Sequence, residues 1–175
     1  MIKLFKLIII LFLFSSCSSS SDEQAQKQNY FFDIAGYFKQ QATLLTNKSV
    51  TKTVSKDKAT ETKTLIVENW EQELQLFTDC DINKAAWKDS YKKDSTSNTL
   101  TYTATDPDLR VRAIKINFQN QLPNKIEIST QSKNLLYHTT ENLVFIPDSL
   151  YQITKHQKVI LLGLHDYKIS GRFKN

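Results

Sequence analysis

The stretch Arg110-Val-Arg-Ala-Ile-Lys-Ile-Asn-Phe-Gln119 decides the fold, because apolar and polar side chains alternate along it. A period of two is typical of a strand that buries one face, since successive side chains in a strand point to opposite faces of the sheet. The residues predicted to face a core are Val111, Ala113, Ile116 and Phe118, with Ile114 left open. We therefore expect a half-buried strand in this part of the chain.

Further runs rich in β-branched and aromatic residues lie on both sides of this strand, and turn residues separate them. The predicted strands are 99–105, 125–131, 135–146, 150–154, 158–162 and 167–173. The predicted turns are 106–108, 122–124, 132–134, 147–148, 155–157 and 163–166. Short strands with a turn signal about every 8–12 residues indicate an antiparallel, meander-rich sheet, because parallel strands need long crossovers between them.

The preceding part of the chain adds a hairpin and helices. β-Branched residues alternate with lysine and serine over 49–67, and Asp57-Lys58 supplies a turn, so this segment is predicted as a hairpin. The predicted helices are 30–46, 69–77 with Asn69 as its cap, and 82–90 with Asp81 as its cap. The prediction is an α+β fold, in which two to three helices of the N-terminal half pack on one face of the sheet.

The chain begins with a pattern typical of a secreted lipoprotein. Two lysines precede an apolar run over 7–14, which is too short to span a bilayer as a helix and fits a signal peptide. The run ends in Phe14-Ser15-Ser16-Cys17. A cysteine directly after small residues resembles the bacterial lipobox, in which the thiol is acylated and becomes the new N-terminus. Phe14 departs from the leucine that is usual at the first lipobox position.

This interpretation divides the chain into a signal peptide over 1–16, a polar tether over 17–28 and a single α+β domain over 29–175. Acylated Cys17 would anchor the domain to a lipid bilayer of the cell envelope. Ser18 fits retention at the outer membrane, and Asp22-Glu23 resembles the export signals of Bacteroidetes surface lipoproteins. We expect an outer-membrane protein that faces the periplasm or the cell surface.

The composition of the chain argues against several classes of partner. The net charge is +5 and the pI is about 9.1, which would suggest nucleic acid in the cytoplasm but not after export. Once Cys17 is acylated, Cys80 has no cysteine left to pair with, so we expect no disulfide-linked partner. No cofactor motif and no cysteine-based metal site is present in the sequence.

Several motifs together resemble a family of small Bacteroidetes lipoproteins without an assigned activity. These motifs are Phe32-Asp33-Ile34, Asn69-Trp70-Glu71, the segment from Asp81 to Trp87, and Tyr167-Lys168-Ile169-Ser170-Gly171. The resemblance covers nearly all of the chain after the lipobox. It implies an envelope location and a single domain, and it carries no activity to this chain.

Six aromatic residues are candidates either for the core or for the lining of an apolar cavity that binds a lipid or another hydrophobic ligand. They are Phe31, Phe38, Trp70, Phe77, Trp87 and Tyr91, all expected from helices that lie on the sheet. A domain of this size normally needs its aromatic residues for the core, which favours the first interpretation.

The remaining candidates are a thiol, three histidines and three carboxylates. Cys80 is either a reactive thiol near a helix N-terminus or a buried residue beside capping Asp81. His156 and His165 are predicted at opposite ends of one strand, roughly 30 Å apart and unable to share a metal. The other candidates are His138 and the carboxylates Glu127, Glu141 and Asp148. The sequence favours a non-enzymatic binding or structural module, ahead of a carrier of a hydrophobic ligand and of an envelope hydrolase.

Overall fold

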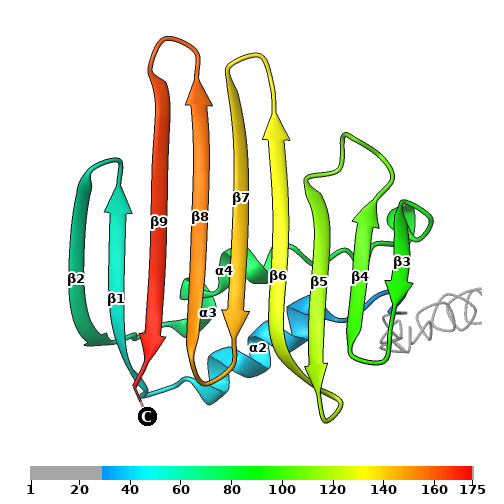
Figure 1. Ribbon diagram of the computed structural model, residues 1–175, viewed down its shortest axis with the longest axis horizontal. Coiled ribbons are helices and arrows are strands. Elements are labelled where there is room, and N and C mark those ends of the chain that lie inside the picture. The colour runs from blue at the N-terminus through cyan, green and yellow to red at the C-terminus, as the bar shows by residue number, and fades with distance from the viewer. Residues whose placement is uncertain (1–28, 175) are drawn as a thin grey trace, which may run out of the picture.

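The computed structural model describes residues 29–174, which form helices packed on one face of a nine-stranded sheet (Figure 1). The helices are α2 (Ile34–Leu44), α3 (Trp70–Glu73), α4 (Gln75–Thr78) and the 3₁₀ helix η1 (Ala85–Trp87). The strands are β1 (Ser49–Lys56), β2 (Ala59–Ile66), β3 (Tyr91–Ser95), β4 (Thr99–Ala104), β5 (Val111–Gln119), β6 (Leu122–Lys133), β7 (Tyr137–Ile146), β8 (Leu150–Val159) and β9 (Gly163–Phe173). The predicted α+β class is confirmed. The predicted signal peptide and tether lie outside the described residues.

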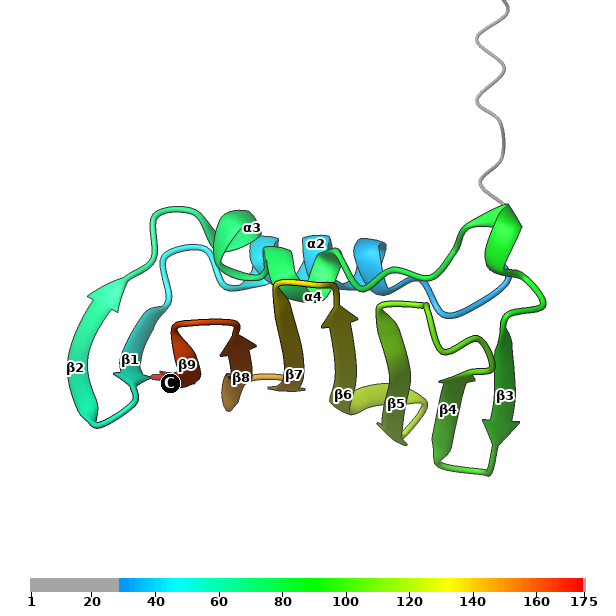
Figure 2. The same cartoon turned by 90° about the horizontal axis from the view of Figure 1, so that it is seen from above.

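Strand order shows how the first hairpin joins the C-terminal strand. Strands β3 to β9 follow one another as an antiparallel meander, and the hairpin β1–β2 joins this meander beside β9. Val50 of β1 pairs with Phe173 of β9, so the predicted hairpin is continuous with the C-terminal strand. Figure 2 shows that the helices lie on one side of the sheet, and that nothing among residues 29–174 covers the other side.

A β-bulge near the start of β5 decides which side chains of the opening stretch face the helices. The register shifts between Val111 and Ala113, so the alternation restarts after the bulge. Val111, Ile114 and Ile116 are buried, whereas Ala113 is half-buried on the other side. The prediction that Ala113 faces the core was therefore wrong, because a bulge adds one residue that a period of two does not anticipate.

The core is closed by aromatic packing between the helices and the middle strands. Phe38 of α2 lies 4.8 Å from Phe77 of α4 and 5.1 Å from Phe145 of β7, measured between ring centroids. Gly171 lies under the ring of Tyr151, and a Cβ atom at this position would overlap that ring. Glycine thus lets a large aromatic side chain lie against the neighbouring strand.

A polar contact ties α3 to the sheet. The Tyr151 hydroxyl donates to Glu73 Oε1 over 2.5 Å, and Lys52 Nζ lies 2.7 Å from the same oxygen. Glu73 comes from α3, Lys52 from β1 and Tyr151 from β8, so one carboxylate joins three elements. Its side chain is only 17 % exposed, and the two partners satisfy it in this partly buried place.

Helix limits follow from side-chain caps. Asp33 Oδ1 accepts from Gly36 N over 2.9 Å, so α2 begins at Ile34, later than predicted. Asn69 caps α3 as predicted, by accepting from Gln72 N, but the single helix predicted over 69–77 divides at Leu74 into α3 and α4. The helix predicted over 82–90 was wrong, because only Ala85–Trp87 is helical.

The segment before η1 is held in place by Asn83. The Asn83 side chain accepts from Phe31 N over 2.9 Å and donates to Phe32 O over 3.2 Å. These long-range bonds tie the segment to the chain that leads into α2, and Asp81 does not start a helix there. The pairing joins residues far apart in sequence, so a local pattern of caps could not reveal it.

Several predictions of strands and turns need correction. The turn predicted at 122–124 lies at Asn120 and Gln121, both of which have positive φ. The turns predicted at 155–157 and 163–166 lie inside β8 and β9, and the chain reverses instead at 160–162, where Leu161 has a φ of 74°. Strand β3 was missed, since Tyr91 is its single large apolar residue and its other residues are polar.

Candidate functional site

The six predicted aromatic residues lie mainly in the core. Phe31, Phe38, Trp70, Phe77 and Tyr91 are buried, and Trp87 is partly buried against them. Tyr91 comes from strand β3 and not from a helix, and its ring lies 5.6 Å from that of Phe31. The five buried rings contact one another or aromatic side chains of the sheet, in the edge-to-face and tilted arrangements that aromatic cores prefer.

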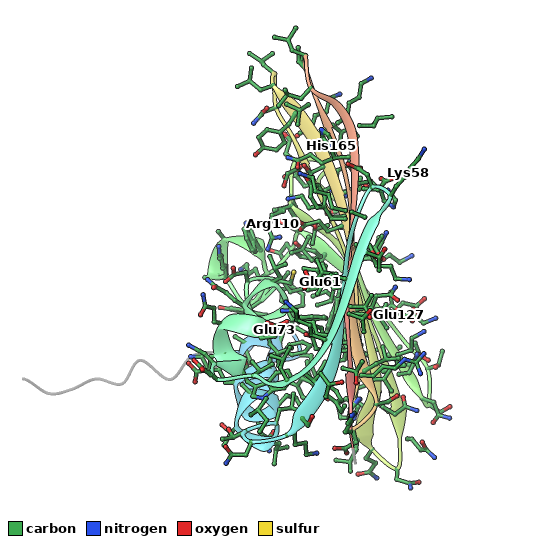
Figure 3. The ribbon with its side chains drawn as sticks, turned by 90° about the vertical axis from the view of Figure 1, so that its left-hand side faces the viewer. Lys58, Glu61, Glu73, Arg110, Glu127 and His165 are labelled. Carbon is green, nitrogen blue, oxygen red and sulfur yellow. The ribbon has the colours of Figure 1, made fainter. Side chains whose placement is uncertain are left out.

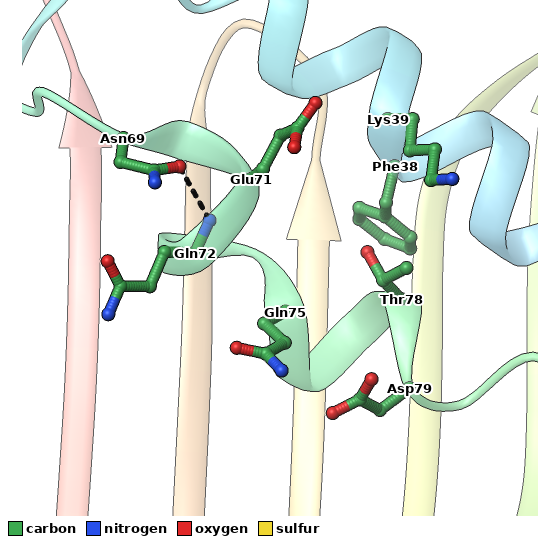
Figure 4. Close-up of a pocket in the computed structure, with 8 residues that line it drawn as sticks. All are labelled: Phe38, Lys39, Asn69, Glu71, Gln72, Gln75, Thr78 and Asp79. Atoms are coloured by element: carbon green, nitrogen blue, oxygen red, sulfur yellow. Dashed lines mark hydrogen bonds between the residues drawn. The ribbon is translucent and has the colours of Figure 1, made fainter.

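A cleft of about 480 Å³ lies outside this core, between α2 and the pair α3–α4 (Figure 4). Its lining residues are Phe38, Lys39, Asn69, Glu71, Gln72, Gln75, Thr78 and Asp79. Of the six aromatic residues, Phe38 alone contributes to it. The walls are therefore mostly polar, and the aromatic packing favours the core interpretation over a cavity for a hydrophobic ligand.

Cys80 occupies a buried position behind α4. Its Sγ donates to the Leu76 carbonyl over 3.1 Å, and Arg110 Nη2 lies 3.7 Å away. Burial raises the pKa of the thiol from 9.0 to about 11, against the lowering effect of Arg110. None of the three histidines is among its hydrogen-bond partners, so the described residues provide no base that could activate this thiol.

The three candidate carboxylates do not converge. Glu141 faces the helix side, where it accepts from Thr130 Oγ1 over 2.9 Å and lies 3.8 Å from both Arg110 and Lys155. Glu127 points away from the helices, on the opposite face of the sheet (Figure 3). Asp148 is exposed in the β7–β8 turn and pairs with Lys48 over 2.9 Å.

The histidines lie closer together than predicted. Because β8 and β9 are adjacent, Gln157 pairs with His165 and His156 pairs with Asp166. His156 Nδ1 lies 2.6 Å from Asp166 and His165 Nδ1 lies 3.3 Å from Asp57. The predicted 30 Å separation was wrong, since the turn falls at 160–162 and folds the strand back. Within residues 29–174, no three metal-ligating side chains gather in one place.

Buried tyrosines make alkaline pH a destabilising condition. Burial raises the pKa of Tyr91 from 10.0 to about 12, and burial together with the Asp148 carboxylate does the same for Tyr37. The folded state therefore keeps protons that the unfolded chain releases, so stability is complete below about pH 10 and is lost as the pH rises through about 12. The decline begins near pH 9, where the thiol of Cys80 loses its proton in the unfolded chain, because the pKa of this thiol is raised in the folded state.

Urea unfolding measured between about pH 8 and pH 12 should show this loss as a falling midpoint. The Tyr37→Phe variant lacks one of the raised groups and should show a shallower decline. If the midpoint fell equally steeply with pH in both proteins, the proposed contribution of Tyr37 would be contradicted.

The sheet presents a wide surface away from the helices, which we call the open face. Its side chains alternate with the buried ones along every strand and are mostly polar. Hydroxyl pairs bridge β1 and β2, with Thr51–Thr64 at 3.0 Å and Thr53–Thr62 at 2.9 Å. Other members of the open face are Thr101, Lys115, Glu127, Ser129, Asn142, Thr154, Lys168 and Ser170.

Two turns at one end of the sheet form a second surface, which we call the apolar tip. Its members are Leu135, Leu136, Ile160, Leu161, Leu162 and Leu164. Ile160 N donates to Leu136 O over 2.9 Å, so the β6–β7 and β8–β9 turns lie side by side beyond the helices (Figure 1). Most of these residues were predicted in strands, so the surface was not anticipated from the sequence. Gly163 and Asn134 beside the apolar runs were the available signal for turns.

Comparisons of the chain with protein-family models, with curated proteins and with solved structures found no match. Within residues 29–174, no helix combines the length and the apolar character that a membrane crossing requires.

Proposed function

We propose that this protein is a lipoprotein of the bacterial cell envelope, anchored through acylated Cys17, whose domain serves as a non-enzymatic binding or structural module. The anchor is supported by the basic start, the short apolar run and Phe14-Ser15-Ser16-Cys17. The bilayer is then one partner, and the outer membrane of a Bacteroidetes cell is the proposed location.

The binding role is supported above all by the open face. A sheet that packs helices on one side normally leaves the other side to water or to a partner. Here that side extends across β2 to β3, with hydroxyl and amide groups that can donate and accept hydrogen bonds. Such a surface fits a polar partner, such as the surface of another envelope protein, better than an apolar one.

The open face can be tested by reversing charge on it. Lys115 and Lys168 are exposed there, on β5 and β9, so Lys115→Glu with Lys168→Glu changes the surface without removing a core contact. The acylated protein is cross-linked in intact cells and purified from membranes, and its co-purifying proteins and lipids are analysed. We expect a partner that the wild type captures and that this variant loses by about tenfold, as for loss of a few interface contacts.

The matched control is Lys39→Glu, which makes the same change on the exposed side of α2. It should retain the partner. Equal capture by all three proteins, or capture lost only with Lys39→Glu, would contradict binding through the open face.

A further inference from the structure

The apolar tip places large aliphatic side chains in water. Leu161 is 99 % exposed, Leu135 is 91 % exposed and Leu162 is 72 % exposed. Single exposed leucines are common on protein surfaces, but a contiguous group at a protruding end marks a place of contact. The tip is convex, since it consists of two adjacent turns that project beyond the helices (Figure 3).

The turns hold these side chains outward by their own structure. Asn134 Oδ1 accepts from both Leu136 N and Tyr137 N, which fixes the β6–β7 turn. Leu161 has a φ of 74°, in the left-handed region that glycine or asparagine adopts at lower cost. Neither burial nor backbone preference favours a leucine at this position, so its side chain is a candidate for a role outside the fold.

Charge close to the tip is mainly positive. The segments 131–138 and 157–165 contain Lys133 and Lys158 and no acidic residue. A cleft of about 460 Å³ beside the end of β6 is lined by three basic residues, Arg110, Arg112 and Lys133, and by one acidic residue, Asp108. Further along the hairpins, the carboxylates of Asp57 and Asp166 each contact a histidine. Leucines flanked by lysines are the combination that favours a lipid surface with anionic headgroups.

We infer that the apolar tip inserts into the surface of a lipid bilayer that carries anionic headgroups. A convex group of leucines can enter acyl chains directly, whereas a protein partner would need a matching pocket. Tyr137 at the base of the tip is partly exposed and suits the headgroup level, where aromatic side chains are enriched.

The proposed anchor would bring this bilayer within reach, and in that respect the inference rests on the proposed function. Residues 17–28 can extend to roughly 40 Å, which is comparable with the length of about 35 Å expected for a strand such as β9. The anchor would then raise the effective concentration of the tip at the membrane, so a tip of moderate affinity would suffice.

The experiment uses a depth-sensitive fluorophore on Leu161→Cys. Cys80 is buried, so the introduced thiol is the accessible one among the described residues. The matched control is Leu122→Cys, which labels an exposed leucine in the β5–β6 hairpin at the opposite end of the sheet. Both proteins are studied acylated in vesicles of phosphatidylglycerol and phosphatidylethanolamine, with quenchers attached to the lipid acyl chains.

A second arm of the experiment tests whether the tip binds the vesicles without the lipid anchor. The same labelled proteins are prepared as chains from residue 17 with Cys17→Ala, which keep the complete described core, and are added to the vesicles from solution. We expect quenching of the Leu161 label in both arms and of the Leu122 label in neither. Adding Leu162→Ser and Leu135→Ser should weaken vesicle binding in the second arm by at least about tenfold.

Failure of the anchor and failure of the tip give different results. A protein that is not acylated but whose Leu161 label is quenched at high lipid would overturn the anchor alone. Absence of quenching in the second arm, or equal quenching of both labels, would overturn the inference. A Leu161 signal that depends on protein concentration without vesicles would also overturn it, because the tip would then bind a second copy of the chain.

Discussion

Replacement of Phe38 by alanine is expected to lower the free energy of unfolding by about 4 kcal/mol, which is a large part of the total stability of roughly 5–15 kcal/mol that is usual for a domain. Phe38 is fully buried and contacts the rings of Phe77 and Phe145. Truncation removes apolar contacts and leaves a cavity that rigid neighbouring strands cannot fill. Urea unfolding followed by tryptophan fluorescence would measure the loss.

The control for this substitution is Leu44→Ala at the end of the same helix. Leu44 is 59 % exposed, so its truncation should change the free energy of unfolding by less than about 0.5 kcal/mol. A small effect of Phe38→Ala would contradict a closed aromatic core. It would instead favour a loosely packed interior that a hydrophobic ligand fills.

The substitution with the largest expected effect on location is Cys17→Ala. Each buried methylene of an acyl chain contributes about 0.8 kcal/mol, so two or more chains hold a protein at a bilayer almost permanently. Without the thiol there is no acylation, and the domain should leave the membrane pellet for the soluble fraction. Any attachment that remains should depend on the apolar tip and on anionic lipid. Western blotting of fractionated cells would measure the change.

Much of the fold follows from local patterns. The alternation in β5 and β6, the cap at Asn69 and the hairpin around Asp57 each predict the element that the structure contains. These features depend on neighbours in sequence, and local chemistry decides them. The errors arise where distant residues decide, as at Asn83, which binds the backbone before α2 instead of permitting a helix.

The candidate surfaces were harder to predict, because both depend on where the turns fall. The run from Val159 to Leu162 is apolar, and such runs are typical of buried strands. The structure instead makes a turn there, with a positive φ at Leu161. The turn exposes the leucines and brings His156 and His165 onto facing strands. The open face could be anticipated from alternation, but its width depends on β1–β2 joining β9.

The most direct test of the proposed anchor is incorporation of radiolabelled palmitate. Cells expressing the wild type or Cys17→Ala are labelled, and the protein is immunoprecipitated and analysed by autoradiography. A labelled band in the wild type and none in Cys17→Ala, at equal protein levels, is the predicted result. Label that persists in Cys17→Ala, or that is absent from the wild type, would contradict the account.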